Sequence, residues 1–422
     1  MYTDIHTHTS MRAITYWLSL GMIFIIPWEN VVHLEGVGTL ARATGILVAG
    51  FWILTVLVTG SFRRLHAFHV VAMLFVLWNG ISVAWSLETE VTLILTITYF
   101  QLFVMVLILW DIYTTPASVR AAMQVYVLGA FVTIASILSN YLFGGEELRR
   151  YTASGFGENR VGLILALGMP IAWYLALFEE YRLRHYWLRL LNFAYIPGAF
   201  TGIMLTGSRA AILGMVPLSL FMIATLGKIK FYQRMLLLTL VIGALIALIP
   251  VIPESTFNRI AATRSEATGG GTSDRLPIWY EGARIFADNP LLGVGSGAFR
   301  SAATETRKSA HNVALALLAE IGVVGFGLFV AILVIAAYQV RFLSKTVAWL
   351  WLTVFSMWFL SALTHSWQYL KPTWLFLGLA MCMVGAYARR SAAASTAGLP
   401  VNLHVPSAHA RKNSAFPLKK SN

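Results

Sequence analysis

The chain has 422 residues, of which 58% are hydrophobic and only 12% are charged, and its mean hydropathy is +0.71. Soluble domains carry about 25% charged residues, so this composition excludes an ordinary soluble protein and indicates a polytopic membrane protein. A net charge of +13 is also typical of nucleic-acid-binding proteins. Here the basic residues follow the expected membrane topology, so we expect no nucleic-acid partner.

A helix needs about 20 apolar residues to cross a bilayer, and twelve segments of the chain meet this requirement. They are residues 14–33, 38–60, 65–84, 91–110, 118–142, 159–178, 190–207, 209–227, 235–252, 312–339, 347–364 and 372–388. The first segment has no small-residue cleavage site after it, so we expect it to be retained. An even number of spans places both termini on the same side.

The expected organisation follows from these segments. Residues 1–252 hold spans one to nine, residues 253–310 form a large outer loop, and residues 311–388 hold spans ten to twelve. Residues 389–422 are rich in Ala, Ser, Pro and Lys without an apolar period, which is typical of a disordered tail. The fold class is therefore an all-α polytopic membrane protein with about twelve transmembrane helices.

Orientation follows from the basic residues, which favour the cytoplasmic side. With the N-terminus inside, the cytoplasmic segments hold 18 of the 31 basic residues and four of the 18 acidic residues. Eleven of the thirteen outer basic residues are Arg, whose planar fork of donors suits phosphate and carboxylate oxygens. Each alone is also explained by pairing with an outer carboxylate or a lipid headgroup, but together they favour a phosphate-bearing ligand.

The outer loop contains a predicted amphipathic helix. Gly269-Gly270-Gly271 indicates a turn-rich segment, and Ser273 or Asp274 is the expected cap of a helix that ends before Asn289-Pro290. Trp279 is expected to pack on the bundle, with ligand contact as its other role. Gly293-Val294-Gly295-Ser296-Gly297 lacks the spacing and the strand–helix context of a dinucleotide loop, so it is interpreted as tight turns.

His311 is the most informative residue, because a lone imidazole beside concentrated guanidinium groups suggests a base next to a bound phosphate. The alternative is a helix cap at the membrane interface. Glu320 lies nine residues further on, which on a continuous helix is the opposite face. The candidates for an orienting partner of the imidazole are therefore in the last outer loop: His365, Gln368 and Tyr369.

Three stretches follow one another in the middle of the chain. They are Gly155-Phe156-Gly157-Glu158-Asn159-Arg160, then Thr206-Gly207-Ser208-Arg209-Ala210-Ala211, then Arg275…Trp279…Phe286-Ala287-Asp288-Asn289-Pro290-Leu291-Leu292-Gly293-Val294-Gly295 with Ala310-His311-Asn312…Glu320-Ile321-Gly322…Gly325. Their order and spacing resemble the signature of the O-antigen ligase and polymerase superfamily. Glu158 and Arg160 depart from the commoner residues of the first motif.

The resemblance implies a lipid-dependent glycosyltransferase with a GT-C-like fold, in the bacterial inner membrane with its active site facing the periplasm. Such an enzyme takes a glycan from undecaprenyl pyrophosphate and, in the ligases, transfers it to a sugar hydroxyl of the lipid A–core. The family's catalytic histidine falls on His311, and its pyrophosphate-binding arginines fall on Arg209 and Arg275. No metal or other cofactor is implied. The single cysteine, Cys382, leaves no thiolate metal site.

A wider set of residues is predicted to bind substrate around this centre: Arg160, Arg264, Arg300, Lys308, Asn312 and Trp279. Direct attack by the acceptor hydroxyl would invert the anomeric carbon, since no buried carboxylate nucleophile is evident. An O-antigen polymerase, which joins lipid-linked repeats, is the first alternative because it shares the motifs. A lipid-linked sugar transporter is a weaker one, because the ionisable residues gather at the outer ends of the spans.

Overall fold

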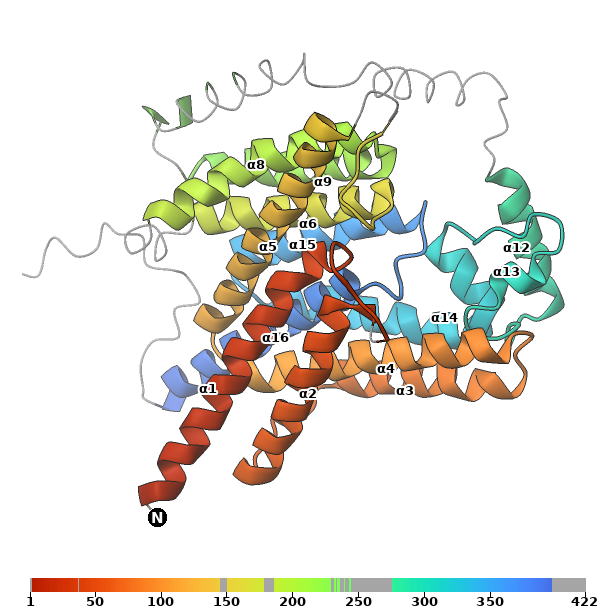
Figure 1. The fold of residues 1–422 in the computed structure, drawn as a ribbon. Coiled ribbons are helices and arrows are strands. Elements are labelled where there is room, and N and C mark those ends of the chain that lie inside the picture. The colour runs from red at the N-terminus through yellow and green to blue at the C-terminus, as the bar shows by residue number, and fades with distance from the viewer. Residues whose placement is uncertain are drawn as a thin grey trace, which may run out of the picture.

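The computed structural model describes residues 2–36, 38–144, 150–177, 186–228 and 275–396, with isolated positions between 231 and 243. These residues form an all-α protein with one short hairpin (Figure 1). Nine of the described helices are long and apolar enough to cross a membrane. The prediction of a multi-pass all-α membrane protein is therefore confirmed.

The described part of the chain contains helices and one pair of short strands. Their bounds are α1 (Tyr2–Ile25), η1 (Ile26–Trp28), β1 (His33–Leu34), β2 (Gly38–Thr39), α2 (Leu40–Thr59), α3 (Ala67–Ile81), η2 (Ser82–Ala84), α4 (Thr89–Ile112), α5 (Pro116–Phe143), α6 (Glu158–Leu177), α8 (Tyr186–Thr206), α9 (Arg209–Leu226), α12 (Leu276–Asp288), α13 (Phe299–Ala302), α14 (Val313–Val340), α15 (Lys345–Ala362) and α16 (Lys371–Thr396).

Most predicted spans coincide with these helices, and the differences lie at their ends. The first span ends at Trp28 rather than at residue 33, because the chain turns at Pro27 into the antiparallel β1–β2 hairpin, in which His33 faces Thr39. The last helix continues to Thr396, past the predicted end at residue 388. Predicted span 235–252 falls almost entirely outside the described residues, as does most of the predicted tail. The segments predicted at 347–364 and 372–388 correspond to the helices α15 and α16, which are not among the nine candidate spans of the described residues.

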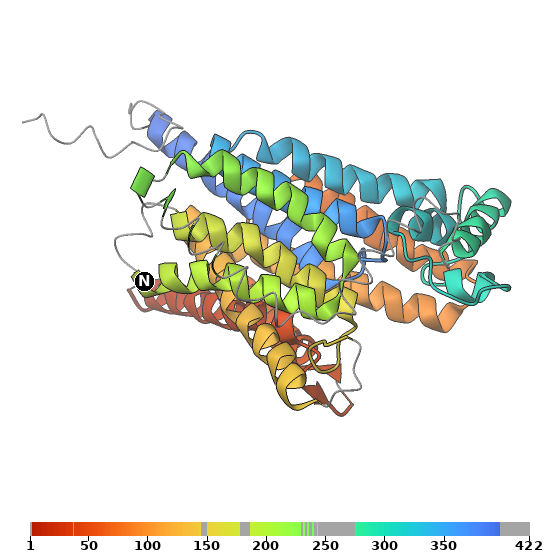
Figure 2. The same cartoon turned by 90° about the horizontal axis from the view of Figure 1, so that it is seen from above.

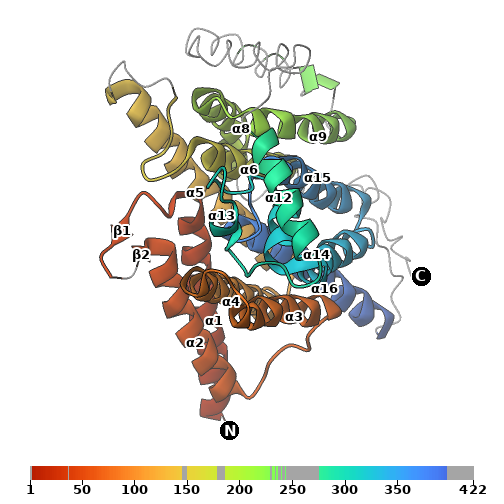
Figure 3. The ribbon, with the colours of Figure 1, turned by 90° about the vertical axis from the view of Figure 1, so that its right-hand side faces the viewer.

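Several long helices, among them α3, α4, α8 and α14, run in nearly the same direction, while α1 and α2 cross that direction (Figure 1). Helices α12 and α13 lie together at one end of the bundle (Figure 2). Seen from that end, α12 and α13 lie across the middle of the bundle (Figure 3). We call this end, which holds His311, the outer end. The opposite end, where α4 ends at Ile112 next to Asp111, is the inner end.

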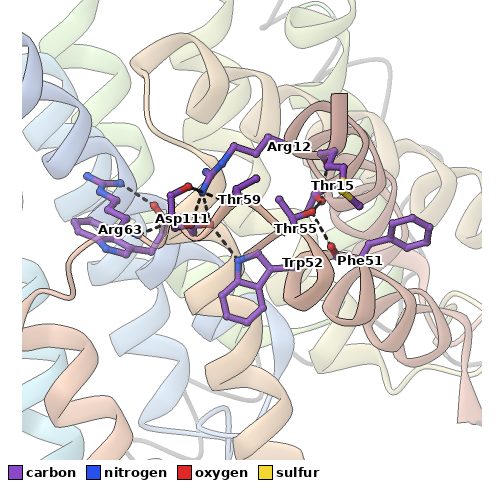
Figure 4. A network of polar contacts seen from close by, with 11 residues as sticks. Arg12, Thr15, Phe51, Trp52, Thr55, Thr59, Arg63 and Asp111 are labelled. Carbon is purple, nitrogen blue, oxygen red and sulfur yellow. Dashed lines mark hydrogen bonds and ion pairs between the residues drawn. The ribbon is translucent and has the colours of Figure 1, made fainter. Parts of the chain in front are cut away.

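A buried carboxylate organises the inner end. Asp111 is only 1% exposed, and it accepts hydrogen bonds from the Trp52 indole at 3.2 Å and from the Arg63 backbone N–H at 3.0 Å. The Arg12 guanidinium lies 3.5 Å from the same carboxylate (Figure 4). The Arg63 guanidinium stacks 3.4 Å from the centroid of the Trp110 ring. A buried charge is stable only when it is paired. The partners of Asp111 come from other segments, so the carboxylate joins four segments of the chain at this end.

Helix α6 is the most enclosed of the nine candidate spans and positions the turn between α8 and α9. A Cβ added at Gly162 would lie 2.8 Å from the Ser208 Cβ, and one at Gly168 would lie 2.3 Å from the Tyr195 hydroxyl. Small residues let neighbouring helices approach closely in a membrane. The two glycines therefore set the distance at which α9 begins, and with it the position of Arg209.

Helix α14 is interrupted at Gly322, whose φ of 67° and ψ of −173° are not helical. Such a break leaves carbonyl groups without their helical partners. Here the N–H groups of Val294 and Gly295 donate to the carbonyls of Ala319 and Glu320, at 3.0 and 2.8 Å. The Trp78 indole donates to the next carbonyl, that of residue 321, at 3.0 Å. The outer loop and α3 thus supply hydrogen-bond donors to the carbonyls at the break.

Candidate functional site

His311 lies just before α14, in a backbone conformation that is unusual for a residue with a side chain. Its φ is +47°, in the left-handed region, which is uncommon for residues other than glycine and is found often at active sites. The next residue, Asn312, caps α14 by accepting the Leu315 N–H at 3.0 Å. The Asn312 amide also donates to the Leu363 carbonyl at 3.1 Å, which fixes the start of α14 to the end of α15.

Two side chains adjoin the half-buried His311 imidazole. The Ser309 hydroxyl is 3.2 Å from its Nε2 atom. The His365 ring lies edge to face against it, with centroids 6.0 Å apart and an interplanar angle of 81°. His365 is one of the three residues that the sequence offered as an orienting partner. Gln368 is buried in the same loop, and its Oε1 atom has no hydrogen-bond partner among the described residues.

Positive charges surround the imidazole and favour its neutral form. Burial, together with the charges of Arg275 and Lys308, lowers the pKa of His311 below its ordinary value of 6.5. The same effects act more strongly on His365, where burial and the charges of Arg275, His311 and Arg150 lower the pKa to about 3. Both rings are therefore neutral at neutral pH, so either can accept a proton from a neighbouring hydroxyl.

Arg209 and Arg275 come from different parts of the chain and meet at the outer end. Arg209 is the first residue of α9, which Ser208 caps by accepting the Ala211 N–H at 3.4 Å. Arg275 precedes α12. Burial and the charge of Arg209 lower the pKa of the Arg275 guanidinium. Two guanidinium groups close enough to repel each other form a place where an anion is stabilised.

Arg150 is a further member of this cluster that the sequence reasoning did not single out. Its Nε atom donates to the Thr206 carbonyl at 2.8 Å, and one of its terminal nitrogens lies 3.4 Å from Glu158. It thereby joins the α8–α9 turn to the start of α6. Its charge acts on His365. The available signal was its place among the outer arginines, just before the motif that begins at Gly155.

A buried carboxylate holds the segment that leads to His311. Glu281 of α12 is 4% exposed. It accepts the backbone N–H groups of Glu305 and Thr306 at 2.8 and 3.1 Å, and the Thr306 hydroxyl at 2.7 Å. Arg284, one turn along α12, is 3.9 Å from it. The loop before His311 is thus attached to the helix that begins next to Arg275.

The other residues predicted to bind substrate have varied surroundings. The Arg160 guanidinium is 3.9 Å from buried Glu29, which also pairs with Lys371. Arg300 lies on α13 and its Nε atom donates to the Arg307 carbonyl at 3.0 Å. Arg264 lies outside the described residues.

The remaining predicted substrate-binding residues are Trp279, Asn312 and Lys308, and each has a different place around His311. The Trp279 ring packs against the apolar cluster between α12, α13 and α14, in agreement with the packing role favoured from the sequence. Its indole nitrogen is buried without a described hydrogen-bond partner. Asn312 is the cap described above, and Lys308 acts on the His311 pKa.

The glycines that follow α12 serve close packing. Gly293, Gly295 and Gly297 all have positive φ values. A Cβ on Gly293 would lie 2.4 Å from the Glu320 backbone, and one on Gly295 would lie 2.2 Å from the Ser86 hydroxyl. Their interpretation as tight turns, and not as a nucleotide loop, agrees with this geometry. The Glu320 carboxylate is 7% exposed and accepts the N–H groups of Gly297 and Phe299, so it supports the same segment.

A family model matches the middle of the chain. Residues 194–330 match a family model described as O-Antigen ligase, and this range contains Arg209, Arg275 and His311. The motif that begins at Gly155 lies outside the matched range. No curated protein matches the chain. Among the described residues, no group of three or more His, Cys, Asp or Glu side chains could hold a metal ion. The resemblance suggested by the motifs is confirmed for residues 194–330.

Proposed function

We propose that this protein is an O-antigen ligase, which transfers a glycan from undecaprenyl pyrophosphate to a sugar hydroxyl of the lipid A–core. The observation that carries the proposal is the position of His311. Its imidazole is kept neutral by burial and by the charges of Arg275 and Lys308, so a base and an anion-binding group are available at one place. The family match over residues 194–330 supports the same class of reaction.

The donor's pyrophosphate is assigned to Arg209 and Arg275. Guanidinium groups bind phosphate oxygens through two parallel hydrogen bonds. The two are close enough for the charge of one to lower the pKa of the other, and a bound dianion would relieve that repulsion. As the glycosyl bond breaks, negative charge develops on the departing phosphate oxygen, where fixed cations stabilise it most.

The acceptor hydroxyl is a weak nucleophile, and His311 is assigned as its base. The hydroxyl oxygen forms a bond to the anomeric carbon while its proton passes to an imidazole nitrogen. The bond from the anomeric carbon to the pyrophosphate oxygen breaks, and its electron pair leaves with the undecaprenyl pyrophosphate. A single displacement of this kind inverts the anomeric carbon. A positioned base accelerates such a step by about 10²–10⁴-fold.

The proposed setting is the bacterial inner membrane, with twelve spans, both termini in the cytoplasm and the His311 site facing the periplasm. Successive long helices of the described chain run in opposite directions between the two ends, which supports this topology. The inner end holds Arg12, Arg63 and Asp111, and the outer end holds His311 and Arg275. Labelling of single cysteines at Ser309 and Ser344 tests this orientation. Labelling of Ser344, but not of Ser309, by an impermeant reagent from the periplasm would refute it.

The test of the activity is reconstitution. Purified protein should transfer glycan from an undecaprenyl pyrophosphate-linked donor to lipid A–core, without added metal and unaffected by chelator. In a parallel reaction, a second lipid-linked repeat replaces the lipid A–core. Product only in that reaction would show the runner-up activity, an O-antigen polymerase. Uptake of donor into vesicles without any transfer would instead show a transporter.

A further inference from the structure

We propose that His365 is a positioning residue, which holds the His311 ring in the orientation required for proton transfer. This inference rests on the proposed function, because it concerns how the base is kept ready. It begins from the edge-to-face contact between the two rings, with centroids 6.0 Å apart at 81°.

The contact matters because the backbone of His311 is strained. A left-handed φ of +47° places the Cβ atom close to the following carbonyl oxygen, and residues persist there only when their surroundings hold them. The Asn312 cap fixes the backbone that follows. On the side-chain side, the imidazole contacts the exposed Ser309 hydroxyl and the His365 ring. A flexible hydroxyl at a loop position cannot restrict the ring alone, so His365 supplies the rigid wall.

The His365 ring is itself held in place by its neighbours. Its ring stacks on Trp367 with centroids 5.2 Å apart at 30°, and its Nδ1 atom lies 3.0 Å from the Thr364 hydroxyl. Trp367 is buried and its carbonyl accepts the Thr373 hydroxyl at 2.8 Å. The loop between α15 and α16 is thus a fixed platform from which the ring of His365 projects toward His311.

The choice of a histidine at this position fits the charges around it. Arg275 and Arg150 act on His365, and Arg275 and Lys308 act on His311. A cationic side chain in place of His365 would add repulsion to this group and further disfavour a proton on His311. His365 stays neutral in this field because its pKa is about 3. It therefore shields the base from water without changing the charge of the site.

Three variants separate positioning from other roles. His365→Phe keeps an aromatic wall and should retain most of the wild-type kcat. His365→Ala removes the wall and should lower kcat by about 10²-fold, the loss expected when a reacting group is displaced by about 1 Å. The donor KM should change little in either, since the pyrophosphate contacts are assigned to other residues. His33→Ala, in the exposed β1 strand, is the matched control and should behave as wild type.

A second readout does not depend on turnover. With ¹³C-labelled histidine, the His311 signal, identified by its loss in His311→Gln, should titrate below the ordinary value in the wild type and in His365→Phe. In His365→Ala it should move upward, because water then reaches the ring. A kcat in folded His365→Phe as low as that of His365→Ala would overturn the proposal, since the nitrogens of His365 would then be needed. Unchanged kcat and titration in His365→Ala would overturn it as well. A wild-type protein that transfers to neither acceptor would contradict the proposed function, while the titration would still test the contact.

Discussion

The arginines at the two ends of the helix bundle have opposite electrostatic surroundings. At the inner end, Arg12 and Arg63 gather around the buried carboxylate of Asp111, and the Arg63 guanidinium is covered by the Trp110 ring. At the outer end, Arg209 and Arg275 repel each other near His311. Within the described part of the chain, the charge that acts on Arg275 is that of Arg209 and not that of a carboxylate.

This difference separates structural charge from charge available to a ligand. A cation that is paired and stacked has its interactions satisfied within the protein, and its removal costs stability. Cations that raise one another's energy are stabilised when an anion binds beside them, so their removal is expected to cost binding or catalysis. Both ends contain arginines in a membrane protein, so composition alone does not distinguish them.

Removal of the base should give the largest effect. His311→Ala should lower the transfer rate by about 10²–10⁴-fold, because the acceptor hydroxyl then loses its proton acceptor. The affinity for lipid-linked donor should stay close to that of the wild type, since the base acts in the transition state. The measurements are kcat with lipid A–core and donor binding by filtration. A near-normal kcat with only a raised donor KM would mean that His311 is a cap or binding group.

The next effect concerns the shape of the outer cations. Arg275→Lys keeps the charge but loses the planar fork, and we expect transfer to fall by about 10²–10³-fold, as for loss of a donor to a developing anion. Arg284→Lys is the control on the same helix, because Arg284 is half exposed and paired with Glu305 at 2.9 Å. That variant should retain its activity. Equal loss in both variants would show a general sensitivity of α12.

The inner end should respond in stability and not in chemistry. Asp111→Ala leaves the Trp52 indole and the Arg63 backbone N–H without an acceptor. Each unsatisfied buried donor costs about 1–3 kcal/mol. The free energy of unfolding should therefore fall by at least the cost of one such donor. Thermal unfolding in detergent measures the loss, and transfer per folded molecule should be unchanged. A lower kcat without a lower Tm would break the contrast between the two ends.

The smallest effect is a shift in the pH profile. The base must be neutral, so activity is lost as the pH falls through the pKa of His311. Burial and the charges of Arg275 and Lys308 place that pKa below 6.5, and wild-type activity should therefore persist below this pH. Lys308→Gln removes one of the charges and should move the half-activity point to higher pH. The profile of kcat between pH 4.5 and 8 checks this, and a shift to lower pH would contradict it.

The sequence indicated the bundle and the central residues because both leave local signals. Apolar runs of about 20 residues predict spans wherever they occur, and the grouping of His311 with Arg209 and Arg275 followed from the resemblance of their motifs. Their proximity in space is then seen in the effect of Arg209 on the Arg275 pKa and of Arg275 on the His311 pKa.

Other features depend on contacts between distant segments and leave no local signal. The left-handed backbone of His311 is fixed by tertiary packing, since nothing in Ala310-His311-Asn312 requires it. Glu281 resembles any exposed helix residue in sequence, yet it is buried by the loop that it binds. A single glycine in an apolar run, such as Gly322, is ordinary in a membrane helix, so the interruption of α14 could not be foreseen.

That interruption also bears on how the substrates of the proposed function would reach the site. The outer loop donates hydrogen bonds to two consecutive α14 carbonyls, those of Ala319 and Glu320, and both residues are buried. Lifting α12 and α13 away would leave these two carbonyls unpaired, at a cost of about 2–6 kcal/mol if each costs about 1–3. This cost reaches the lower end of the stability of a whole domain, which is about 5–15 kcal/mol. The outer loop is therefore held firmly against α14, and under the proposed function a lipid-anchored substrate would reach the site from the plane of the bilayer and not by displacement of α12 and α13.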